Sequence, residues 1–213
     1  MNRSALIAVV LDRSGSMNSI KEDVVGGLDR FIADQRKEPG YCSITLAQFD
    51  TEYEVVWSGR DVKDVPSAST FYVPRGGTAL LDAVGRTINE VGAELAKRPE
   101  GERPSAVIFC IVTDGHENAS KEFTKAQVRQ MIEHQTAKYQ WSFTYLGANQ
   151  DSFKEAGAIG IAARATMDFA ASDAGVRGSF ASLSSASARR RAGETLAYAP
   201  AERSAAKGEG EKP

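Results

Sequence analysis

Cysteine and histidine are scarce in this chain, with two residues of each among 213. Cys42 and Cys110 each lie within a short apolar run, and no CxxC pair or Cys/His cluster accompanies them. Zinc sites in proteins are usually built from such clusters, so the sequence argues against one. We expect both cysteines to be reduced thiols in the core, although two cysteines on strands could also pair.

An excess of positive charge is also missing, because the formal net charge is -2. The chain therefore has no overall basic field of the kind that favours nucleic acid, and we expect no nucleic-acid partner. Arg189, Arg190 and Arg191 form a local basic patch, which we interpret as a solvated helix face.

Long apolar runs are absent as well. No stretch approaches the roughly 18 apolar residues of a membrane span. The run from Leu6 to Leu11 stops at Asp12, which makes it too short for a secretory signal. We therefore expect a first β-strand, no membrane partner and a cytoplasmic location.

What the chain does contain is an alternation of apolar runs and helical patterns. Continuous or alternating apolar residues predict strands at 6–11, 43–49, 53–57, 106–112, 141–146 and 165–169. Between them, apolar residues at helical spacing predict helices. The order predicts an α/β fold with a doubly wound, mostly parallel sheet, one antiparallel hairpin strand and helices on both faces. This is a Rossmann-like arrangement.

The periodic pattern fails near Gly193, where the chain becomes rich in Ala, Gly, Glu and Lys. We therefore predict one domain over residues 1–192 and a disordered tail over 193–213. Removal of residues 194–213 should then leave the thermal stability nearly unchanged.

Three polar clusters fall where ligands bind in open α/β sheets, at the carboxyl ends of strands. The segment Asp12 to Ser16 follows the first strand, Gly76-Gly77-Thr78 opens a helix, and Thr113-Asp114-Gly115 follows a later strand. Carboxylates and hydroxyls are hard oxygen ligands, which suit Mg²⁺, Mn²⁺ or Ca²⁺. Each residue taken alone could instead cap a helix or form a turn.

The run Asp12-Arg13-Ser14-Gly15-Ser16 resembles the DxSxS motif of the von Willebrand factor A (vWA) family, and Thr78 and Asp114 match the family's separate threonine and aspartate. The similarity covers roughly residues 5–170, and the chain looks similar to single-domain cytosolic members from bacteria and phages. It implies a metal-ion-dependent adhesion site (MIDAS) ligated by Ser14, Ser16 and Thr78. Asp12 and Asp114 would act directly or through water. It also implies a protein partner that supplies a Glu or Asp to the metal.

Other residues flank this predicted site and could contact a partner, although ordinary surface or packing roles are at least as plausible for each. They are Arg13, Met17, Arg75, Gly76, Gly77, His116 and Glu117.

Enzymatic readings have less support. A phosphatase-like metal-dependent hydrolase remains the alternative, but such enzymes usually carry a second carboxylate two residues after the first, where this chain has Ser14. No GxGxxG follows the first strand, which argues against dinucleotide binding. No GxSxG is present at a strand-to-helix turn, which argues against a serine hydrolase. We expect no catalytic residue, and His116 is not assigned as a base.

Overall fold

A six-stranded sheet forms the centre of the computed structural model, which describes residues 4–209. The strands are β1 (Ala5–Asp12), β2 (Cys42–Phe49), β3 (Tyr53–Asp61), β4 (Ala106–Thr113), β5 (Ser142–Ala148) and β6 (Thr166–Phe169), in the order β3-β2-β1-β4-β5-β6. Every neighbouring pair is parallel except β2 and β3, which form an antiparallel hairpin. The predicted fold class is confirmed.

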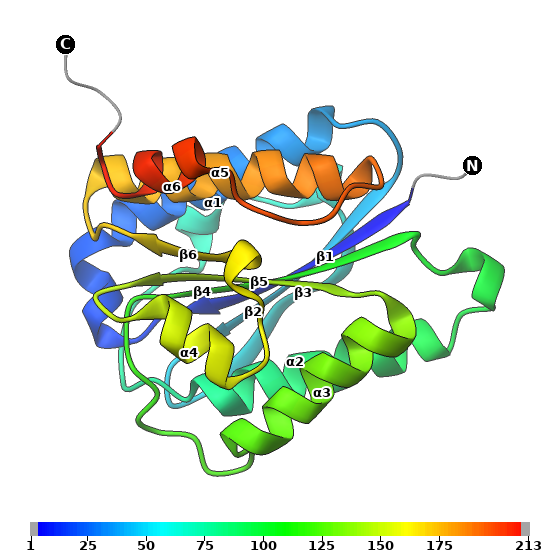
Figure 1. Cartoon of the computed structure of the whole chain (residues 1–213), viewed down its shortest axis with the longest axis horizontal. Coiled ribbons are helices and arrows are strands. Elements are labelled where there is room, and N and C mark those ends of the chain that lie inside the picture. The colour runs from blue at the N-terminus through cyan, green and yellow to red at the C-terminus, as the bar shows by residue number, and fades with distance from the viewer. Residues whose placement is uncertain (1–3, 210–213) are drawn as a thin grey trace.

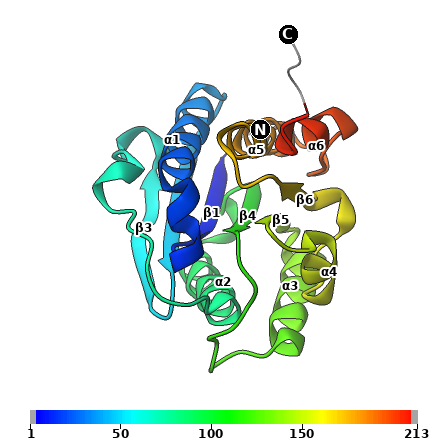
Figure 2. The ribbon, with the colours of Figure 1, turned by 90° about the vertical axis from the view of Figure 1, so that its left-hand side faces the viewer.

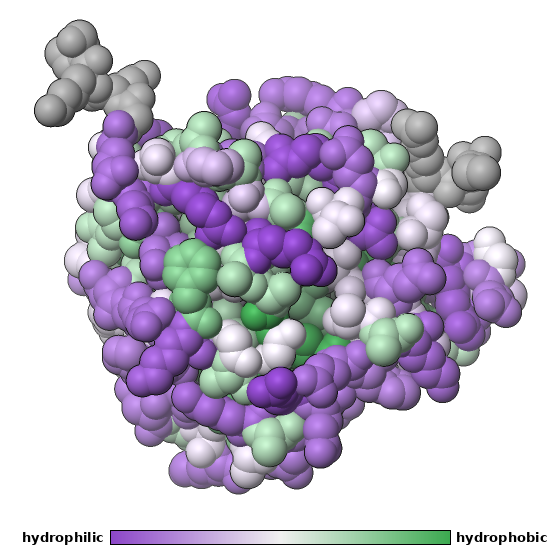
Figure 3. All heavy atoms as spheres, viewed as in Figure 1, coloured by the Kyte–Doolittle hydropathy of each residue, from purple (hydrophilic) through white to green (hydrophobic). Residues whose placement is uncertain are grey.

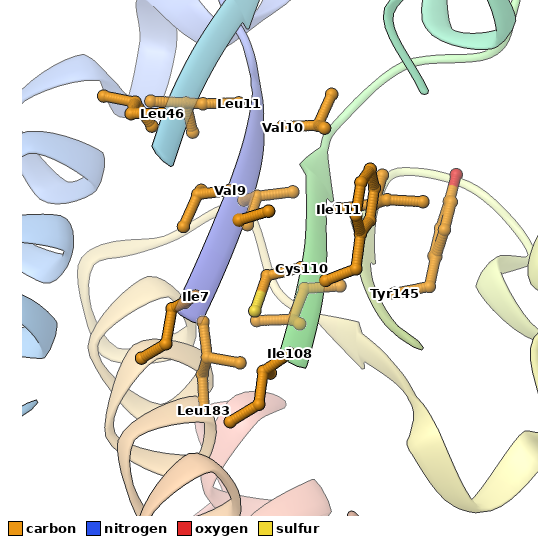
Figure 4. Packing of buried hydrophobic residues seen from close by; sticks show 14 of the residues in the cluster. Ile7, Val9, Val10, Leu11, Leu46, Ile108, Cys110, Ile111, Tyr145 and Leu183 are labelled. Carbon is orange, nitrogen blue, oxygen red and sulfur yellow. The ribbon is translucent and has the colours of Figure 1, made fainter. Parts of the chain in front are cut away.

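The central strands are apolar throughout because both of their faces are covered. Every residue of β1, β2 and β4 is buried. Along β1, Ile7 and Val9 point toward the side of the sheet where Leu183 lies, while Val10 points to the other side (Figure 4). Cys42 and Cys110 are buried, unpaired thiols within this core.

Helices lie in two layers around the sheet. Helices α1 (Lys21–Lys37), α5 (Asp173–Arg191) and α6 (Pro200–Ala206) cover one face, and α2 (Leu80–Ala96), α3 (Lys125–Tyr139) and α4 (Ser152–Ala158) cover the other (Figures 1 and 2). In residues 4–209, no helix combines the length and the apolar character needed to cross a membrane.

The prediction of a disordered tail from residue 193 is wrong for residues 193–209. This segment returns along α5 and forms α6, while Leu196, Tyr198 and Ala206 become buried. The Tyr198 hydroxyl lies 2.7 Å from the hydroxyl of Thr144 on β5. The segment docks through a few separated apolar residues, which have no helical spacing for a sequence pattern to detect. Residues 210–213 of the predicted tail lie outside the described residues.

Candidate metal centre

The predicted ligands lie at one edge of the sheet, where the carboxyl ends of the parallel strands meet. Asp12 ends β1 and a 3₁₀ turn over Gly15–Ile20 follows it, while Asp114 comes directly after β4. Thr78 lies just before α2. Figure 2 looks onto this edge, which is the left-hand side of Figure 1.

Hydroxyl and carboxylate oxygens of these loops are in direct contact. The Ser14 and Ser16 hydroxyl oxygens are 3.1 Å apart, and Ser16 Oγ donates to Asp114 Oδ1 at 2.5 Å. The third hydroxyl faces the same place, since a Cβ added at Gly115 would lie 3.3 Å from Thr78 Oγ1 and 3.5 Å from Ser16 Oγ. The glycine keeps this space open.

Asp12 is fully buried beneath the hydroxyls and is held by two short hydrogen bonds. The Ser14 backbone N–H donates to Oδ1 at 2.6 Å, and the Thr113 hydroxyl donates to Oδ2 at 2.5 Å. Burial raises the pKa of Asp12 to about 6, and the hydrogen bonds from Thr113 and Ser14 oppose that rise. Each oxygen accepts one hydrogen bond and keeps a second lone pair, so Asp12 can act on a metal directly or through bound water.

Asp114 differs from Asp12 because one of its oxygens has no partner. Its Oδ2 atom is buried without a hydrogen bond, and burial raises the pKa of this carboxyl group. A buried carboxylate oxygen without a donor is costly unless a cation balances it. The donor set of two carboxylates and three hydroxyls fits a hard divalent cation. Within residues 4–209, no group of three or more His, Cys, Asp or Glu side chains could hold a metal ion, and the candidate site itself has two carboxylates.

The loop after β4 holds Thr78 in place. Asn118 Oδ1 accepts from the Thr78 backbone N–H at 2.9 Å. One Glu117 oxygen accepts from the Leu81 backbone N–H at 2.9 Å, at the N-terminus of α2, and the other accepts from Ala119 and Ser120. The carboxylate of Glu117 is therefore occupied in capping the helix. Its predicted place on a partner-binding rim is not supported by this geometry.

Two further rim predictions are wrong. Met17 belongs to the 3₁₀ turn that follows Asp12, and its side chain is fully buried in the hydrophobic core. Arg13 is 5% exposed, and its guanidinium forms ion pairs with Asp50 at 3.0 Å and Glu54 at 2.6 Å. Neither side chain has surface to offer a partner.

The remaining rim predictions fall on accessible surface. Arg75, Gly76 and His116 are exposed and Gly77 is half-buried. Gly76 has a φ of 68°, and a Cβ there would press within 3.3 Å of Asp50. Glycine is the residue that adopts this backbone conformation without strain.

Residues that support the site were missed by the sequence analysis. Thr113 was grouped with Asp114 but given no role, although its hydroxyl orients Asp12. Asp50 follows the predicted strand 43–49 and has no assigned role above, yet its carboxylate pairs with both Arg13 and Arg75. Its position at the carboxyl end of β2 was an available signal. Tyr72 donates to the Asp12 carbonyl at 2.7 Å, and nothing in the sequence pattern indicated this contact.

No protein-family model matches the chain, and no curated protein matches it in sequence. Solved structures do match its fold. The vWF domain of the type V pilus tip protein Mfa5 from Porphyromonas gingivalis covers 87% of this chain and 95% of its own, with a TM-score of 0.65 and 10% identity.

Two other structural neighbours hold metals. Proximal thread matrix protein 1 from the mussel byssus, with a zinc-occupied MIDAS motif, has a TM-score of 0.61 at 15% identity over 87% of this chain. The match spans 46% of that protein, so the chain covers less than half of its length. Manganese-loaded TRAP protein from Plasmodium vivax has a TM-score of 0.57 at 14% identity, over 78% of this chain and 68% of its own. The chain therefore has the fold of a von Willebrand factor A domain.

Proposed function

We propose that this chain is a metal-dependent protein-interaction module, and that it is not an enzyme. Its site would hold Mg²⁺, or Mn²⁺ or Ca²⁺, on Ser14, Ser16, Thr78 and Asp114, with Asp12 acting directly or through water. The observation that carries the proposal is the buried, unpartnered Oδ2 of Asp114 beside three hydroxyls that converge on Gly115.

The chain's own residues would orient the ligands before the ion arrives. Thr113 and the Ser14 N–H fix Asp12, Asn118 fixes the backbone of Thr78, and Ser16 hydrogen-bonds to Asp114. A divalent ion bound there would supply an electrophilic centre that can accept a carboxylate oxygen from a partner protein. Ser16 is exposed, and so are Gly76 and His116 beside it, so a partner could reach this position. The metal-loaded structural neighbours support the choice of a divalent cation.

The second carboxylate that phosphatase-like hydrolases usually carry two residues after the first is missing from the described site. The position two residues after Asp12 is Ser14, whose hydroxyl lies against that of Ser16. His116 is exposed on the loop after β4. The interaction role is therefore favoured over the phosphatase-like alternative.

A pull-down with and without chelator, read by mass spectrometry, tests the proposal. The wild type and the control Thr136→Ala, which removes an exposed hydroxyl on α3, should retain the same partner in Mg²⁺ and lose it in EDTA. Thr78→Ala should lose the partner in both buffers. Replacing the partner's acidic contact residue with its amide should have the same effect.

The proposal would be refuted if the same partner were retained in EDTA and also by Thr78→Ala. Phosphoester turnover in Mg²⁺ that Asp12→Ala abolishes would replace it with the hydrolase.

A further inference from the structure

The three consecutive arginines at the end of α5 have different surroundings. Arg189 forms a two-pronged ion pair with Glu202 of α6, at 3.0 and 2.9 Å. Arg191 is buried and donates to Gln35 and to the backbone carbonyls of residues 38–40. Both side chains hold the C-terminal helices in place, so their presence is explained by the fold.

Arg190 has no comparable partner. Its Nε donates to Ser142 Oγ at 2.7 Å and one terminal nitrogen reaches the Gln140 carbonyl at 3.3 Å. Among residues 4–209, no carboxylate lies within the 4.0 Å ion-pair distance of this guanidinium. Burial lowers the pKa of Arg190, and no nearby acid offsets that effect. Arg190 is half-buried in the last turn of α5, and its two hydrogen bonds use two of the five N–H donors of the guanidinium. The other N–H groups remain available to an anion.

Arg190 lies in the wall of a cavity of about 370 Å³. Buried apolar side chains from α3, β5 and the segments around β6 line the cavity, namely Ile132, Trp141, Phe143, Ile161 and Leu196. Figure 3 shows the molecule from the same side as Figure 1, with a hollow near the middle. Hydrophobic residues lie at the floor of the hollow and hydrophilic residues lie around it. A volume of this size is within the range of small-molecule sites.

The charged groups around the cavity favour an anion. Arg164 also lines it, is exposed, and forms no ion pair within the described residues. Glu194 is the one acidic side chain in the lining, and it is exposed and ion-paired to neither arginine. A planar carboxylate matches the fork of a single guanidinium.

We propose that this cavity binds a small organic carboxylate with an apolar body, such as an aryl-acetic or medium-chain fatty acid. Arg190 would take the carboxylate, and Trp141 and Phe143 would take the apolar body. Ser142, the first residue of β5, lines the cavity, whereas the candidate metal centre follows the last residues of β1 and β4. The two sites are therefore at opposite edges of the sheet and do not depend on each other.

Titration of the full chain, followed by ¹H–¹⁵N NMR, tests this site with phenylacetate, indole-3-acetate and octanoate as probes. At least one probe should shift the resonances of cavity residues saturably, with a Kd at or below about 1 mM. The neutral phenylacetamide should bind about tenfold more weakly than phenylacetate, since it loses the charge-assisted pair.

Substitutions separate a built site from general hydrophobic binding. Arg190→Gln should weaken the best probe about tenfold or more, and Arg190→Lys should weaken it less because the charge remains. Arg177→Gln is the matched control, because Arg177 lies exposed on the same helix, paired with Asp173. It should change nothing.

The proposal is overturned if none of the three carboxylates shifts the cavity resonances at about 10 mM. Equal binding of phenylacetate and phenylacetamide would also overturn it. So would unchanged affinity in both Arg190 variants.

Discussion

At the scale of single residues, the raised pKa of the buried Asp12 carboxyl can be tested directly. Its carboxyl is fully buried and its pKa is raised to about 6. A raised pKa means that the folded, metal-free protein prefers the protonated acid. This group therefore adds no penalty below about pH 4, and its ionisation lowers the stability as the pH rises through about 6.

The first prediction compares the wild type with Asp12→Asn in EDTA. The free energy of unfolding of the variant minus that of the wild type should be larger at pH 7 than at pH 4, by on the order of 3 kcal/mol. The reason is that the variant carries no buried charge at either pH. Urea unfolding of both proteins between pH 4 and pH 8 measures this. A stability difference between the two proteins that does not vary with pH would show that burial does not raise the pKa of Asp12.

The second prediction concerns Thr113, whose hydroxyl donates to Asp12 Oδ2. Thr113→Val keeps the shape of the side chain but removes the donor, so the ionised carboxylate loses a charge-assisted hydrogen bond of about 1.5–3 kcal/mol. We expect Mg²⁺ to bind at least about tenfold more weakly at pH 7, because ligand orientation depends on such supporting bonds. Unchanged affinity, measured by calorimetry, would show that Thr113 has no supporting role.

The sequence located the oxygen-bearing residues, because their types and their positions after strands are visible in one dimension. It could not predict which way neighbouring side chains turn. Arg13 and Met17 are next to predicted ligands in the sequence, yet both are buried. Met17 is buried within a short 3₁₀ turn, and Arg13 forms a buried ion pair with Asp50. Such orientations depend on residues far away in the chain.

At the scale of elements, the contact between α1 and α5 gives the third prediction. A Cβ at Gly27 would lie 2.3 Å from the Phe180 ring, whereas one at Gly26 would meet nothing within 4 Å. Gly27→Ala should cost about 1–3 kcal/mol through overpacking. Gly26→Ala, one residue away on the same helix, should stabilise by about 0.4–1 kcal/mol. Thermal melts of both variants measure the pair, and equal effects would mean that α5 does not pack there.

The segment after α5 gives the fourth prediction. Leu196 is buried, while its neighbour Thr195 is exposed. If residues 193–209 dock as described, Leu196→Ala should destabilise the protein by about 2–5 kcal/mol. Thr195→Ala should change the stability by less than about 0.5 kcal/mol. A disordered segment would leave both variants as stable as the wild type in chemical unfolding.

At the scale of the whole molecule, the sheet and its layers could be predicted because the fold repeats one pattern. Buried parallel strands are apolar throughout, and the helices between them have an apolar stripe, so β1, β4 and α2 are visible in sequence. Helix α6 was missed because its docking rests on tertiary contacts, such as Arg189 with Glu202 and Tyr198 with Thr144. No local period records those contacts.

The central claim is that Ser14, Ser16, Thr78 and Asp114 hold one divalent cation, and calorimetric titration with Mg²⁺ and Mn²⁺ tests it most directly. The wild type and Thr136→Ala should bind one ion per chain with the same affinity. Thr78→Ala and Asp114→Asn should lose most of that affinity, and circular dichroism should show that both remain folded. Equal metal affinity in all four proteins, or no binding to the wild type, would contradict the claim.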